Sequence, residues 1–214
     1  STRRATLFPY TTLFRSNLLL GAGALAIGGT WALRPSDNSR PHSVYFASLQ
    51  DTLRQAGLMR PCAVIDLDRL DHNIDVSTRA LAKAGKQLRI VEKSLPSPEL
   101  LSYIRERSGS KRLMSFHLPF LIADTQNMPD ADILLGKPMP VAAAAEFYAA
   151  VRGPFKAEQQ LQWLIDTPER LKQYQELAVG LGLRMNINIE LDVGLHRGGV
   201  TSTKMMSEML AIIS

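Results

Sequence analysis

The sequence contains a single cysteine, Cys62, and this scarcity excludes two kinds of structural site. No disulfide can form within the chain, and a cysteine-based zinc site needs more than one thiolate. Cys62 lies in an apolar segment, where a packed and unreactive thiol is the usual case. The four histidines do not cluster at metal-ligand spacing. The sequence therefore predicts no metal site within these residues.

The sequence also has little excess positive charge outside its first 16 residues. The formal charge is +5, but Arg3, Arg4 and Arg15 lie within residues 1–16, which contain no acidic residue. Removing these three arginines lowers the formal charge to +2, and the remaining basic residues are scattered. No basic stripe with interleaved aromatic residues is present, so we predict no nucleic-acid partner.

Long apolar runs are few, and the clearest covers residues 18–33, which are uncharged. This run is shorter than the ~20 residues of a membrane-spanning helix. It suits a signal peptide or signal anchor, with a buried helix of the domain as the alternative. The segment predicts a periplasmic or inner-membrane-anchored protein. Before it, residues 6–16 are similar to a translated sequencing adapter, so we interpret residues 1–16 as an artefact and exclude them from fold reasoning.

The remaining chain divides into a leader and a domain. Residues 17–34 form the signal-like or anchor-like segment, and residues 35–57 form a linker with a leading helix at 46–57. From residue 63 onward, strand-like and helix-like patterns alternate. The expected strands cover residues 63–67, 88–92, 112–116, 132–135, 161–165 and 184–192. The expected helices cover residues 68–84, capped by Asp68, and residues 98–107, 118–125, 141–151, 167–179 and 202–214.

This alternation predicts an α/β fold with a parallel sheet and right-handed crossovers. The chain ends inside an apolar helical pattern, so we expect a truncated reading frame. Residues 58–214 are predicted to form a partial (β/α)8 barrel, cut off before completion.

Two of the expected strands end in turns that carry cations. Lys93 follows the apolar run at 88–92, and the strand ending at Asp192 leads into a glycine-rich turn with His196 and Arg197. Parallel strands end at one edge of a sheet, which predicts a shared active-site rim. An amine there can form an imine with an aldehyde cofactor. The alternative is that both cations are solvated residues at strand ends.

Three segments then resemble one family. They are residues 61–74, residues 88–94 with 97–100 around Lys93, and residues 190–200 around Arg197. Over residues 60–214 the chain resembles the fold-type III pyridoxal-phosphate (PLP) enzymes with an alanine racemase-like N-terminal barrel. Within this group it looks most like the D-threonine aldolase and D-serine dehydratase branch.

The resemblance implies roles for individual residues. Lys93 would hold PLP as a Schiff base and would later transfer the substrate α-proton. Arg197 would lie near the phenolic oxygen of the cofactor ring. Gly194 would let the backbone turn sharply and Asp192 would order that turn, while His196 would contact substrate or line the rim. The family's C-terminal β-domain, and the divalent metal ligands of the aldolase branch, would lie beyond residue 214.

Departures from the family leave the reaction open. Aldolases of the family carry histidines and a second lysine where Val91, Leu95 and Pro96 stand, and racemases carry a tyrosine where Ser97 stands. The expected function is a PLP-dependent lyase acting on D-amino acids or β-hydroxy amino acids, or alternatively a racemase or a non-catalytic PLP carrier. We expect these 214 residues alone to be inactive. The complete protein is expected to bind a small amino-acid substrate, to form a homodimer and to be membrane-anchored through residues 18–33.

Overall fold

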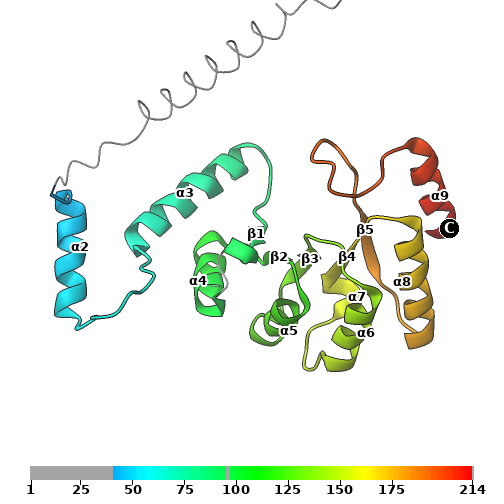
Figure 1. Ribbon diagram of the computed structural model, residues 1–214, viewed down its shortest axis with the longest axis horizontal. Coiled ribbons are helices and arrows are strands. Elements are labelled where there is room, and N and C mark those ends of the chain that lie inside the picture. Colours follow the sequence, from blue (N-terminus) through cyan, green and yellow to red (C-terminus); the bar gives the residue numbers. More distant parts are fainter. Residues whose placement is uncertain (1–40, 95–96, 214) are drawn as a thin grey trace, which may run out of the picture. The chain divides into compact units, whose positions relative to one another are not determined.

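The computed structural model describes residues 41–94 and 97–213 (Figure 1). The adapter-like and anchor-like segments predicted within residues 1–34 lie outside this range. The chain separates into two compact units between Ala63 and Val64. Within the described residues, no helix is both long and apolar enough to cross a membrane.

The described part of the first unit contains one helix, α2 (Val44–Gln55). Ser43 caps its amino end, where the Ser43 hydroxyl accepts a hydrogen bond from the Phe46 amide at 3.5 Å. Gly57, at φ 69°, follows the last turn and adopts the left-handed conformation that glycine favours. The helix predicted at 46–57 is therefore present, displaced by two residues.

The second unit is built on a five-stranded sheet in which every strand is parallel to its neighbours. The strands lie in chain order: β1 (Ile90–Val91), β2 (Arg112–Ser115), β3 (Asp132–Leu135), β4 (Leu161–Ile165) and β5 (Asn186–Ile189). Chain-order parallel pairing is the arrangement of consecutive strands in a (β/α)8 barrel. The predicted α/β fold with a partial barrel is confirmed.

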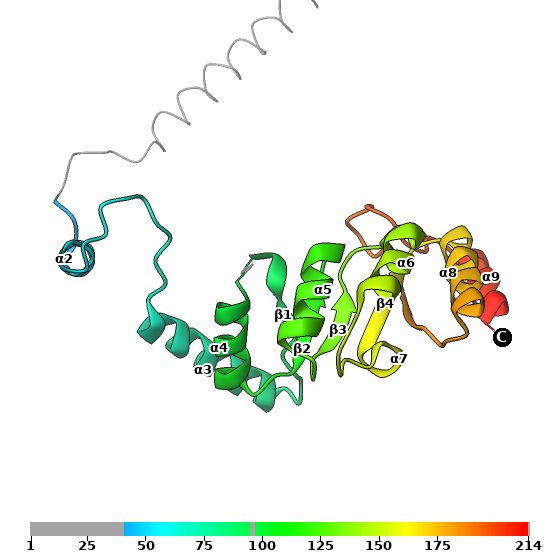
Figure 2. The same ribbon diagram turned by 90° about the horizontal axis from the view of Figure 1, so that it is seen from below.

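Helices connect the strands and pack against one another in sequence. They are α3 (Leu67–Lys83), α4 (Pro98–Ser108), α5 (Leu118–Asn127), α6 (Val141–Ala150), α7 (Ala157–Gln160), α8 (Pro168–Leu181) and α9 (Thr203–Ile213). Figure 2 shows α4, α5, α6 and α8 following one another along the sheet, and each contacts the next. The sequence did not predict α7, which buries no residue, whereas the amphipathic patterns predicted the others because each of them buries an apolar face.

Burial alternates along the strands and thereby distinguishes two faces of the sheet. Leu113, Ile133 and Trp163 are fully buried and belong to the core shared with the helices. The intervening residues Met114 and Gln162 remain partly exposed. Because successive strand residues point to opposite faces, we call the first set the covered face and the second set the open face.

The predicted strand at 63–67 is wrong. Residues 61–66 have no regular secondary structure, and Leu67 begins α3. A short apolar run becomes a strand only when a neighbouring strand satisfies its backbone groups, and no strand pairs with it among the described residues. The helix is capped by Asp66, which accepts a hydrogen bond from the Arg69 amide at 3.0 Å, rather than by Asp68. Cys62 is exposed, not packed.

Several element ends also differ from the predictions, among them both ends of β5, which covers Asn186–Ile189 rather than 184–192. Strand β1 ends at Val91, because residues 92–94 turn into a 3-10 helix, η1 (Glu92–Ser94). Helix α8 continues past Gly180 and ends at Gly182, whose φ of 63° closes the helix. A glycine within the last turn of a helix does not by itself end it. The left-handed residue does.

Trp163 offers a test of the core. It is fully buried on β4, its ring contacts Phe147 and Tyr174, and its indole N–H donates to the Tyr148 hydroxyl at 3.0 Å. We predict that Trp163→Ala lowers the free energy of unfolding by ~3–5 kcal/mol, measured by chemical denaturation. Val179→Ala at an exposed site of α8 should change it by less than ~0.5 kcal/mol. A loss below ~1 kcal/mol for Trp163→Ala would contradict this packing.

Candidate active site

The carboxyl-terminal edge of the sheet carries both turns singled out in the sequence. Lys93 lies in η1 directly after β1, and residues 190–200 follow β5. Strands β1 and β5 are the two outer strands, with β2, β3 and β4 between them. The structure thus brings both turns to the same edge, and it does not place Lys93 in contact with Asp192 or His196.

Lys93 is exposed, and its amine lies over an aromatic ring. Its Nζ is 4.7 Å from the centroid of the Phe116 ring, a cation–π distance. Phe116 is the first residue after β2, so it belongs to the same edge. The described residues leave the amine accessible to solvent. Phe116 itself was not found by sequence reasoning.

Gly136, the first residue after β3, makes room for this aromatic ring. A Cβ at Gly136 would lie 2.6 Å from Cζ of Phe116 and 2.7 Å from Cγ of Met114, closer than real contacts allow. Its amide donates to the Ser115 carbonyl at 2.8 Å, which extends the pairing of β2 and β3 to the edge. The Phe116 ring therefore depends on the absence of a side chain on the neighbouring strand.

The side chain next to Lys93 in sequence lies on the opposite side of the sheet. Glu92 is 1% exposed, and the Ser115 hydroxyl donates a hydrogen bond to it. Asp124 of α5 is 4% exposed and lies beside Glu92. Burial, together with the hydrogen bond and the negative charge of Glu92, raises the pKa of Asp124 to about 9. Two buried carboxyl groups thus lie directly beneath the candidate lysine.

The turn after β5 is organised by Asp192. One carboxylate oxygen accepts hydrogen bonds from the amides of Gly194 at 3.4 Å and His196 at 3.0 Å, and the other lies 2.9 Å from Nδ1 of His196. The hydrogen bond with the His196 side chain is the largest cause that lowers the pKa of Asp192. His196 has a φ of 51°, an uncommon conformation for a residue with a side chain. Arg197 is exposed on the same turn.

The turn closes back on the strand that precedes it. The Val200 amide donates to the Glu190 carbonyl at 2.8 Å, and the Asp192 amide donates to the Val200 carbonyl at 3.0 Å. Gly199, at φ 96°, passes so close that a Cβ would lie 2.7 Å from the Glu190 carbonyl oxygen. This close approach requires glycine and gives the exposed loop a fixed base.

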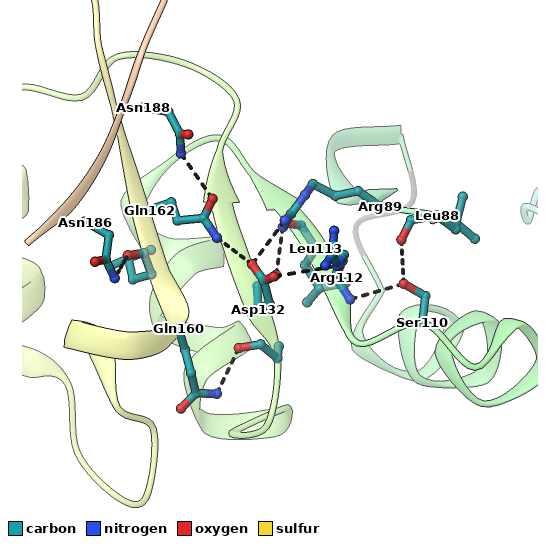
Figure 3. Close-up of polar contacts among 12 residues, drawn as sticks. Leu88, Arg89, Ser110, Arg112, Leu113, Asp132, Gln160, Gln162, Asn186 and Asn188 are labelled. Atoms are coloured by element: carbon teal, nitrogen blue, oxygen red, sulfur yellow. Dashed lines mark hydrogen bonds and ion pairs between the residues drawn. The ribbon is translucent and has the colours of Figure 1, made fainter. Parts of the chain in front are cut away.

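The opposite end of the open face is held by polar side chains (Figure 3). Asp132 accepts hydrogen bonds from Arg89 at 3.1 Å and from Gln162 at 2.8 Å, and Asn188 donates to Gln162 at 3.1 Å. Arg89 also donates to the carbonyls of Leu113 and Asp132, both at 2.9 Å. These contacts join segments near the amino ends of the strands, so they fix the sheet without occupying the edge that carries Lys93.

The comparisons with known proteins agree with this architecture. The model of the family "Alanine racemase, N-terminal domain" matches residues 65–214. The chain belongs to this family, whose members are pyridoxal-phosphate-dependent enzymes of fold type III. No curated protein sequence matches the chain significantly.

Two solved structures illustrate the shared fold. D-threo-3-hydroxyaspartate dehydratase from Delftia sp. HT23 is 23% identical with a TM-score of 0.61, and the match covers 72% of this chain and 39% of that one. Histidine racemase from Leuconostoc mesenteroides subsp. sake NBRC 102480 is 20% identical with a TM-score of 0.55, covering 67% and 36% respectively. The chain therefore spans less than half the length of these relatives.

No metal centre is evident in the part of the chain that the structure describes, since no group of three or more His, Cys, Asp or Glu side chains is arranged to hold an ion there. The chemistry available at the edge is that of an amine, a guanidinium and an imidazole. These groups suit an aldehyde and an anion better than a cation.

The Asp192 turn gives a direct electrostatic prediction. Because the His196 side chain is the largest cause of the lowered pKa of Asp192, His196→Ala should raise that pKa towards its ordinary value of 3.8. NMR titration of the Asp192 carboxyl carbon measures the change. Val193→Ala, at an exposed position of the same turn, should leave the titration in place. An unchanged midpoint in His196→Ala would show that the contact does not form in solution.

Proposed function

We propose that the protein is a PLP-dependent lyase that acts on D-amino acids or β-hydroxy amino acids, with Lys93 as the residue that binds the cofactor. The observation that carries the proposal is the position of the Lys93 amine, which stands at the carboxyl edge of a parallel sheet over the Phe116 ring. Ligand sites of (β/α)8 barrels lie at this edge. Membership of the alanine racemase N-terminal domain family supports the same assignment.

The residues present fit PLP chemically. An exposed primary amine at the edge can bond to the cofactor aldehyde. The exposed guanidinium of Arg197 would face the phenolic oxygen of the ring, where a permanent cation steadies negative charge. When bound, PLP supplies an electron sink for the carbanion formed at the substrate α-carbon. In its neutral form, Nζ of Lys93 would accept the α-proton, and His196 would contact substrate or line the rim.

A racemase of the same fold is the second candidate, and the likeness to histidine racemase supports it. Racemases of the family use a tyrosine where Ser97 stands. The Ser97 hydroxyl accepts a hydrogen bond from the Leu100 amide at 3.3 Å and donates to Glu99 at 2.8 Å. This hydroxyl is thus engaged in capping α4, so no free hydroxyl stands where the racemase tyrosine would lie.

Cofactor capture at Lys93 can be measured directly. The protein is incubated with PLP, reduced with borohydride, digested and analysed by mass spectrometry. We expect the pyridoxyl adduct on Lys93 and its loss in Lys93→Ala. Lys137 is a second exposed lysine near the same edge, directly after Gly136, and Lys137→Ala should retain the adduct. An adduct spread evenly over surface lysines would contradict the assignment.

The reaction class needs a separate assay on the complete protein. With D-threonine, D-serine or D-threo-3-hydroxyaspartate, a lyase yields an aldehyde or a keto acid, whereas a racemase yields only the amino acid inverted at its α-carbon. We predict carbonyl products and a loss of at least about 100-fold in kcat for Lys93→Ala, because general base catalysis contributes that much. Inversion at the α-carbon alone would identify the racemase, and cofactor binding without turnover would identify a carrier.

A further inference from the structure

Two consecutive residues of η1 lie on opposite sides of the sheet. Lys93 stands over the Phe116 ring on the open face, whereas Glu92 is 1% exposed on the covered face. An acidic side chain at that depth is rare unless it is paired. Its burial must therefore be stabilised by the groups around it.

Three elements supply those groups. The Ser115 hydroxyl at the end of β2 donates to Glu92, and Asp124 approaches from α5. Arg105 of α4 contributes positive charge to the same site, and this charge opposes the shift in Asp124. The guanidinium is already bound to Asp130 through Nη2 at 2.8 Å, and Lys111 lies 3.1 Å from that same carboxylate. The cation is therefore only partly available to the buried carboxyl groups.

We propose that Glu92 is a positioning residue for Lys93: clamped between Ser115 and Asp124 beneath the sheet, it fixes η1 so that the amine stands on the open face. This inference rests on the proposed role of Lys93. The buried Glu92 side chain ties η1 to the helical layer through Asp124 of α5. Without it, η1 would lose this tie to the helical layer and keep its link to β1 and its contacts with β2.

The clamp requires one retained proton. Two adjacent buried carboxyl groups cannot both ionise without strong repulsion, and Asp124 is the one held neutral at pH 7 because its pKa is raised to about 9. A neutral Asp124 can donate a hydrogen bond to Glu92, which then accepts from both Asp124 and Ser115. Asp124 Oδ2 is buried without a hydrogen-bond partner among the described residues, which favours the neutral form of this carboxyl group, because an unpaired buried charge is costly.

The proton also sets the direction of a pH effect. The folded pKa of Asp124 lies above its ordinary value of 3.8, so its contribution to stability is complete below that value and declines as the pH rises towards about 9. An asparagine at this position would need no added proton, since its amide donates at any pH. Asp124→Asn should therefore keep the clamp. It should also remove the part of the fall in melting temperature with rising pH that comes from ionisation of Asp124.

Hydrogen exchange of residues 91–94, measured by mass spectrometry and corrected for intrinsic pH dependence, tests the clamp itself. We expect Glu92→Ala to raise exchange there, while Glu92→Gln and Asp124→Asn keep it close to that of the unmodified protein. Glu106→Ala, at an exposed acidic residue of α4, is the matched control. Unchanged exchange in Glu92→Ala would overturn the proposal, as would equal loosening in Asp124→Asn.

Borohydride labelling with PLP links the clamp to the amine. We expect Glu92→Ala to lower the rate of labelling at Lys93 by about 100-fold, the scale of a displacement near 1 Å, with labelling at other lysines unchanged. Glu92→Gln should restore it. If Lys93 is unlabelled in the unmodified protein while exchange still responds to Glu92→Ala, the proposed function fails and the clamp stands. If labelling is normal in Glu92→Ala, the positioning role fails and the proposed function stands.

Discussion

Successive side chains along each strand of the parallel sheet point alternately to the covered face and to the open face. This alternation determines where the candidate groups lie. Residues such as Leu113, Ile133 and Trp163 point into the core and are inaccessible to ligands. Their neighbours point to the open face, where Asp132 and Gln162 bond to one another near the amino ends of the strands. Chemistry is thereby restricted to the carboxyl edge, which parallel strands reach together and where loops are free to vary.

At that edge, the backbone turn at η1 separates two side chains with opposite requirements. Glu92 is buried among hydrogen-bonding groups, and Lys93 is accessible to a small molecule. The amine gains its position from its buried neighbour and from the Phe116 ring, and the ring in turn depends on Gly136. A reactive lysine on a strand end requires this kind of support, because a loss of ~1 Å in placement is costly to reactivity.

Much of the fold follows from sequence pattern. Strands β3 and β4 have the predicted bounds because apolar runs with clear turn signals define them. The strand predicted at residues 63–67 does not form. A strand needs a neighbouring strand to pair with, and a local sequence pattern does not reveal whether one is present. The candidate edge was predicted by the cations that follow β1 and β5. Phe116, Gly136 and Asp124 were missed because only the packing of neighbouring strands and helices brings Phe116 to Lys93, Gly136 to Phe116, and Asp124 to Glu92. Glu92 resembles an ordinary solvated residue in the sequence, and its burial is a tertiary property.

The central claim is that the Lys93 amine on the open face captures the cofactor aldehyde. A crystal structure of the protein grown with PLP tests it most directly. We predict continuous density between Nζ of Lys93 and the cofactor, at the carboxyl edge beside Phe116, with Glu92 still buried on the covered face. Density joining the cofactor to another lysine, or a Lys93 side chain directed away from the bound cofactor, would contradict it.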